Sequence, residues 1–88
     1  MTPPQLIYEV EPEFSEEARK AKHQGVVVLT IEVDPGGHVR NVRVRQSLGL
    51  GLDEKAIEAV SHWRFRPAIL DGKPVTTEAV VQFNFQLL

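Results

Sequence analysis

The side chains that could perform chemistry in this chain are few and scattered. Nucleophilic catalysis needs a nucleophile held next to a base, but the chain has no cysteine, and Ser15, Ser47 and Ser61 stand in no catalytic motif. The adjacent carboxylates Asp53 and Glu54 are explained by the start of a helix, where negative charge is favourable. A chain of 88 residues also leaves little volume for a concave catalytic pocket. We therefore expect no enzymatic activity.

Metal binding is not indicated either. The histidines are His23, His38 and His62, and we interpret none of them as paired with another histidine or with a carboxylate at a metal-ligand spacing such as i, i+4. His23 at a helix end and His38 in a turn are interpreted as surface residues. We expect no metal ion and no cofactor.

Arginines cluster in the middle of the chain and would suit nucleic acid or anionic lipid. However, no aromatic residues interleave with them, and the chain as a whole carries a net charge of −2. A solvated sheet face is the better interpretation, and we expect no nucleic-acid partner. The arginines concerned are Arg40, Arg43 and Arg45, and Arg64 and Arg66 could come close to them in the fold.

The strongest pattern lies near the C-terminus, where residues from Val75 to Leu87 alternate between apolar and polar, with Val80 as an exception on the polar side. Such alternation is typical of a long, half-buried β-strand. A strand of this length in so small a protein is not expected to be paired along both sides. Part of its row of N–H and C=O groups should then be open to another chain.

The composition of this strand favours docking over a passive edge. The alternative is an ordinary sheet strand whose edge is protected by its own polar residues. Between Thr76 and Leu87, however, there is one charged residue, Glu78, and neither Lys nor Pro, which are the usual guards of an unpaired edge. We predict that the partner-binding residues are Ala79, Val80, Val81, Gln82, Phe83, Asn84, Phe85, Gln86 and Leu87.

The elements that position this strand follow from local signals. Ser15 is the predicted N-cap of a helix from Ser15 to Gln24, with Gly25 just past its end. Strands are predicted from Val26 to Asp34 and from Val39 to Ser47, joined by the turn residues 34–37, with a bulge or irregular entry near Val39. A second helix carries an apolar stripe of Leu52, Ala56, Ala59, Val60 and Trp63.

These elements predict an α+β fold with two layers. An amphipathic helix must cover a sheet, so we expect a three-stranded antiparallel sheet with two helices packed on one face. Residues 1–12 form an extended segment or a linker remnant, because Leu6, Tyr8 and Val10 alternate until Pro12. Residues 13–88 form the domain, and the Pro-containing start suggests excision from a longer protein. Whether residues 5–11 join the sheet is left open.

Several short motifs together resemble one known family. They are Gln24-Gly25-Val26-Val27-Val28, the turn from Val33 to Val39, Leu52-Asp53-Glu54-Lys55-Ala56, and Trp63-Arg64-Phe65-Arg66-Pro67 ahead of Gly72-Lys73-Pro74-Val75. In order and spacing they resemble the C-terminal domain of TonB energy-transducing proteins, over nearly everything from Glu13 to Leu87. One departure is Phe14-Ser15, where the family often has Tyr-Pro. Phe14 keeps the apolar anchor and Ser15 supplies a cap instead of a helix-starting Pro.

The resemblance implies a periplasmic binding module rather than an enzyme. Its parent chain would carry an inner-membrane helix in an ExbB–ExbD-like motor complex and a Pro-rich linker. The domain would dock the N-terminal peptide of an outer-membrane transporter by β-strand addition and pass on mechanical work for uptake. Similar domains occur in TolA-like proteins and attached to sensors. The rival hypothesis is a structural or assembly domain whose open edge pairs with its own copy as a homodimer, or with another periplasmic protein.

Overall fold

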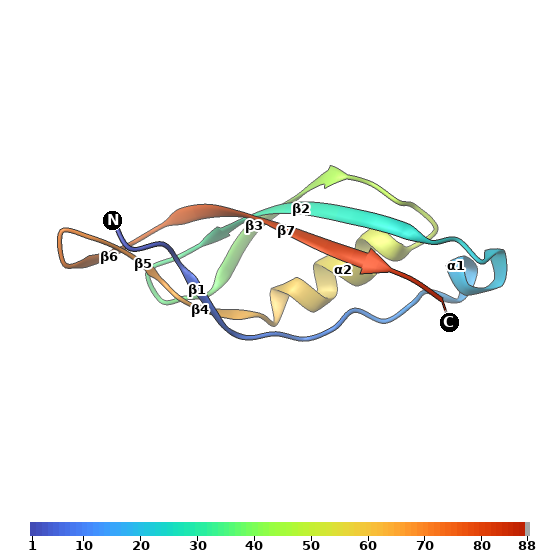
Figure 1. The fold of residues 1–88 in the computed structure, drawn as a ribbon, viewed down its shortest axis with the longest axis horizontal. Coiled ribbons are helices and arrows are strands. Elements are labelled where there is room, and N and C mark those ends of the chain that lie inside the picture. Colours follow the sequence, from blue (N-terminus) through green and yellow to red (C-terminus); the bar gives the residue numbers. More distant parts are fainter. Residues whose placement is uncertain (88) are drawn as a thin grey trace.

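The structure is a computed structural model that describes residues 1–87 (Figure 1). The molecule is elongated, about 50 Å along its longest axis, and contains two helices and seven strands within residues 1–87. The elements are β1 (Gln5–Tyr8), α1 (Glu16–Ala21), β2 (Gly25–Val33), β3 (Val39–Gln46), α2 (Leu52–Ser61), β4 (Arg64–Arg66), β5 (Ala68–Leu70), β6 (Lys73–Val75) and β7 (Thr77–Phe85).

The main sheet has three antiparallel strands in the order β3-β2-β7. β2 is the central strand, in keeping with its apolar residues on both faces near its start. Its hairpin to β3 turns as predicted, because one carboxylate oxygen of Asp34 accepts hydrogen bonds from the backbone N–H groups of Gly36 and His38, each at 2.9 Å.

β3 is irregular where the sequence predicted irregularity. Thr30 is paired with Arg43 and Glu32 with Arg40, so β3 contains one more residue than β2 over this stretch. Asn41 lies in this stretch, and its φ of 51° is in the left-handed region that Asn tolerates. A second shift lies between Val28 and Leu29. β3 is therefore bulged at two points.

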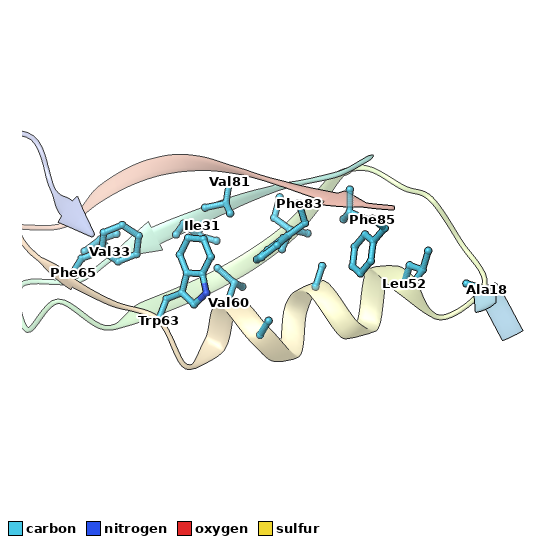
Figure 2. Packing of buried hydrophobic residues seen from close by; sticks show 14 residues of the cluster. Ala18, Ile31, Val33, Leu52, Val60, Trp63, Phe65, Val81, Phe83 and Phe85 are labelled. Atoms are coloured by element: carbon cyan, nitrogen blue, oxygen red, sulfur yellow. The ribbon is translucent and has the colours of Figure 1, made fainter. Parts of the chain in front are cut away.

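The core lies between this sheet and α2 (Figure 2). β7 sends Val81, Phe83 and Phe85 toward the helix, as the alternating sequence predicts. The Trp63 and Phe83 rings meet edge to face with centroids 5.3 Å apart. The predicted α+β fold, with a three-stranded antiparallel sheet and two helices, is therefore confirmed.

α1 is shorter than predicted and ends differently. Ser15 is the N-cap, since its Oγ accepts a hydrogen bond from the Ala18 N–H at 3.2 Å. The helix stops at Ala21 because Lys22 takes the left-handed conformation, with φ 53°, so the predicted end next to Gly25 is wrong. α1 lies at one end of the sheet in Figure 1, and Ala18 is its buried residue.

The N-terminal residues pair with a part of the chain that the sequence did not predict as strand. β1 runs antiparallel to β4, with Gln5 opposite Arg66 and Leu6 opposite Phe65. Thr2 exchanges two backbone hydrogen bonds with Ile69, at 2.8 and 3.0 Å. The β1–β4 pair is separate from the main sheet, and β5 and β6 form a further hairpin. Residues 2–8 are thus held along residues 64–69.

Candidate strand-docking edge

The main sheet ends in two different edges. The edge formed by β3 is bulged and carries Arg40, Arg43 and Arg45. β7, in contrast, matches β2 residue for residue from Thr77 to Phe85 with no shift in register. Within residues 1–87 no strand pairs with the outer side of β7. Bulges and cations discourage further pairing, so β7 is the less protected of the two edges.

Two side-chain contacts establish which way the backbone groups of β7 point. The N–H of Leu87 donates to Oε1 of Gln24, which directly precedes β2, at 2.7 Å. Because N–H groups alternate along a strand, those of Phe85, Phe83 and Val81 face the same way, toward β2.

The second contact agrees. Gln46 of β3 donates to the Val26 carbonyl at 3.3 Å, so the backbone polar groups of Val26 face β3. Those of Val27, which is opposite Phe83, then face β7. The N–H and C=O groups of Gln82 and Asn84 accordingly point away from β2, along the outer edge.

Seven of the nine docking residues predicted from the sequence lie in β7, and the other two, Gln86 and Leu87, follow it. Residues 79–85 lie in β7, where Val81, Phe83 and Phe85 are buried and the residues between them are exposed. Val80 is 57% exposed, as the one apolar side chain on the outward face. Gln86 and Leu87 continue beyond the end of β7.

A groove runs along this edge. Its second side is formed by residues 9–14, which we call the strap and which cross from β1 to α1 below β7 in the view of Figure 1. The groove has a volume of about 370 Å³. Its lining consists of Glu9, Val10, Glu11, Pro12, Phe14, Trp63, Gln82, Phe83, Asn84, Phe85 and Gln86.

Two contacts of aromatic side chains hold the strap in place. Trp63 donates a hydrogen bond from Nε1 to the Val10 carbonyl at 2.9 Å. The Phe14 ring packs edge to face on Phe85 of β7, with centroids 5.5 Å apart. The sequence predicted residues 1–12 as an extended segment or linker and did not predict that residues 9–12 line a groove. The available signal was Trp63, because a buried indole N–H normally finds an acceptor.

The positive charges of β3 are partly neutralised by neighbouring carboxylates. Arg43 forms an ion pair with Glu78 of β7 at 2.6 Å, and Arg40 forms one with Asp34 at 2.8 Å. The hydrogen bond from Arg40, together with those from the His38 and Gly36 N–H groups, lowers the pKa of Asp34 to about 2. The arginines of β3 thus belong to the solvated sheet face, in agreement with the preferred interpretation.

The histidines differ from expectation in two respects. His38 lies 3.6 Å from Asp34, a carboxylate four residues before it, so the statement that no histidine has a carboxylate at this spacing is wrong. His23 is half-buried rather than fully on the surface, and its Nε2 lies 2.7 Å from the Leu48 carbonyl oxygen. The His23 contact links the loop after α1 to the loop after β3, whereas the His38 contact lies within the β2–β3 turn. Among residues 1–87, no group of three or more acidic or histidine side chains is arranged to hold a metal ion.

The serines are engaged in structural hydrogen bonds. Ser15 donates to the Leu50 carbonyl at 2.5 Å, and Ser47 donates to the carboxylate of Asp53. Asp53 also accepts from the backbone N–H of Leu48 at 2.8 Å. These contacts tie the loop before α2 to α1 and to the helix start. In the described part of the chain, no helix is long and apolar enough to cross a membrane.

The architecture defines the class: a small two-layer α+β domain whose three-stranded sheet leaves one long, regular edge uncovered beside a groove. The family model for the Gram-negative bacterial TonB protein C-terminal matches residues 10–87, and the chain belongs to this family.

Curated relatives agree with the family. The chain is 35% identical over 80 residues to the protein TonB of Vibrio cholerae, covering 90% of this chain and 33% of that protein. It is 34% identical over 77 residues to the protein TonB of Xanthomonas campestris pathovar campestris, covering 86% and 34%. The chain thus spans about a third of the length of these relatives.

A solved structure supports the fold. The solution NMR structure of the Pseudomonas aeruginosa TonB CTD matches with a TM-score of 0.77 and 22% sequence identity. The match covers 96% of this chain and 86% of the other.

Proposed function

We propose that this domain binds an extended peptide by β-strand addition to β7, and that the peptide is the N-terminal segment of an outer-membrane transporter. The observation that carries the proposal is the outer edge of β7. It is regular over nine residues, has no bulge and no cation, and borders a groove. Main-chain hydrogen bonds to such an edge give affinity that depends little on sequence, and alternate side chains add selectivity.

The membership in the TonB C-terminal family supports a role in energy transduction. We propose that the domain, residues 13–88 with an extended segment before it, lies in the periplasm and belongs to a longer protein anchored in the inner membrane. An ExbB–ExbD-like motor would act through that missing N-terminal part. The domain itself would pass on mechanical work derived from the proton-motive force and would catalyse no reaction.

Amide hydrogen exchange, read residue by residue, tests the binding mode. The N–H groups of Val81 and Phe83 face β2, whereas those of Gln82 and Asn84 face outward. Adding a transporter N-terminal peptide should therefore slow exchange at Gln82 and Asn84 and leave Val81 and Phe83 nearly unchanged, because the latter are already paired. Amides of β3 serve as the internal control.

Protection that appears along β3 and not at Gln82 and Asn84 would place the peptide on the opposite edge. No protection anywhere at saturating peptide would reject strand addition altogether.

A further inference from the structure

We propose that the strap, residues 9–14, is the charge-selective wall of the docking groove, and that it favours extended peptides carrying a Lys or Arg on the strap side. This inference rests on the proposed function, because it assumes that a peptide strand lies along β7. Beyond the proposed function, it specifies the charge of the preferred peptide and the residues that would select for that charge.

The strap is fixed in position on both sides of its acidic residues. Before it, residues 2–8 are paired along residues 64–69, including the two hydrogen bonds between Thr2 and Ile69. Within it, the Val10 carbonyl accepts the Trp63 hydrogen bond, and Phe14 contacts Phe85. The strap is thus held as a wall facing β7.

Residues 2–8 position the strap and add little to the hydrophobic core. All four side chains of β1 are exposed, and Leu6, Ile7 and Tyr8 are 42%, 59% and 58% exposed. Burial of these side chains therefore stabilises the fold little. Because the backbone of β1 pairs with β4, the strap that follows it begins at a fixed position beside the groove.

The charges that border the groove have one sign. The charged residues that line it are Glu9 and Glu11, and the uncharged polar residues on the opposite side are Gln82, Asn84 and Gln86. No Lys, Arg or His of the described residues lines this groove. Glu11 also borders a shallow hollow next to Lys55, yet neither Glu9 nor Glu11 forms an ion pair within residues 1–87. Their carboxylates are available to a cation on the bound peptide.

The size of the preference follows from exposure. Glu9 and Glu11 are exposed to water, where a single ion pair contributes little. We expect a Lys-containing peptide to bind about threefold more tightly than its Gln counterpart, and a Glu-containing peptide about threefold more weakly. The difference should shrink in about 0.5 M salt, where the screening length falls to a few ångströms.

The probes are end-capped synthetic peptides of roughly ten residues that alternate Val and Thr, with one position set to Lys, Gln or Glu. Moving that position along the peptide finds the side that faces the strap. Affinity is measured by fluorescence anisotropy with the full 88-residue chain, at low and at high salt. The test variant is Glu9→Gln/Glu11→Gln. The matched control is Glu54→Gln/Asp71→Asn, which changes the net charge equally at exposed residues outside the groove.

The proposal predicts that the Lys-over-Glu ratio collapses toward one in Glu9→Gln/Glu11→Gln and persists in the control variant. An unchanged ratio in the test variant, or a Glu peptide that binds best, would overturn it. If all three peptides bind equally and protect Gln82 and Asn84, the charge selection is wrong while strand addition stands. If none of them binds, both proposals fail.

Discussion

The indole nitrogen of Trp63 donates a hydrogen bond at 2.9 Å to the backbone carbonyl of Val10, a residue 53 positions earlier in the chain. The same ring packs against Phe83 on β7. One side chain just after the end of α2 therefore contacts both walls of the groove beside β7. The core of the domain and the shape of its candidate binding site depend on the same residue.

Replacing Trp63 should destabilise the whole domain. Trp63→Ala removes a side chain that is 8% exposed, and we expect a loss of about 3–5 kcal/mol in the free energy of unfolding. Urea denaturation measures it. Tyr8→Ala is the control, because Tyr8 is an aromatic residue that is 58% exposed, and its replacement should cost at most about 0.5 kcal/mol. Equal midpoints for Trp63→Ala and wild type would show that the ring is not part of the core.

A pair of proline substitutions on β7 separates binding from folding. Gln82→Pro removes an N–H that points outward, so the domain should stay folded and lose most of its affinity for a transporter peptide. Val81→Pro removes an N–H directed at β2 and should unfold or strongly destabilise the domain. Circular dichroism reports folding and a peptide titration reports binding.

Arg43→Ala completes this comparison from the other edge strand, since Arg43 lies on β3 and contacts Glu78. Its peptide affinity should stay close to that of wild type. Loss of binding in Arg43→Ala, with normal binding by a folded Gln82→Pro variant, would move the site from the β7 edge to the basic face.

Two glycines with similar backbone angles should respond differently to alanine. A Cβ on Gly37 would lie 2.0 Å from the Phe65 carbonyl oxygen, whereas a Cβ on Gly72 would meet nothing within 4 Å. Both have positive φ, 82° and 78°, so alanine at either costs about 1–2 kcal/mol in strain. Gly37→Ala should cost clearly more, because it also separates β4 from the hairpin. Similar thermal midpoints for the two variants would contradict the close approach.

Acid should remove the contribution of Asp34. Its folded pKa is about 2, below the ordinary value of 3.8, because Arg40 and two backbone N–H groups bind the ionised form. The folded state therefore gains stability from this group above about pH 4, and loses it as the pH falls toward about 2. The difference in urea midpoint between wild type and Asp34→Asn should shrink over that window. A difference that does not change between neutral and acidic pH would refute the assignment.

Self-association tests the rival hypothesis. The uncovered β7 edge should let copies pair weakly, so we expect a monomer at low micromolar concentration and a dimer that grows as the concentration rises. Sedimentation velocity over a dilution series distinguishes the states. A dimer that persists at every dilution would favour an assembly role for the edge over peptide capture.

The sequence by itself determined the elements whose signals are local. The alternation of β7 places Val81, Phe83 and Phe85 on the core side because side chains alternate strictly along a strand. The Asp34 turn and the Ser15 cap follow from hydrogen bonds over a few residues. The pairing of Asp34 with His38 was local as well and was overlooked.

Only the tertiary structure decided how distant segments meet. The strap becomes a groove wall because Trp63 reaches Val10 and because residues 2–8 pair with residues 64–69. The alternation of Leu6, Tyr8 and Val10 indicated an extended segment, but β1 has no buried side chain, so the pattern did not indicate which strand it pairs with. The early end of α1 was likewise set by Lys22 taking a conformation usually left to glycine. Backbone pairing between remote, exposed segments depends on where the packed core brings them, and the order of residue types does not encode that proximity directly.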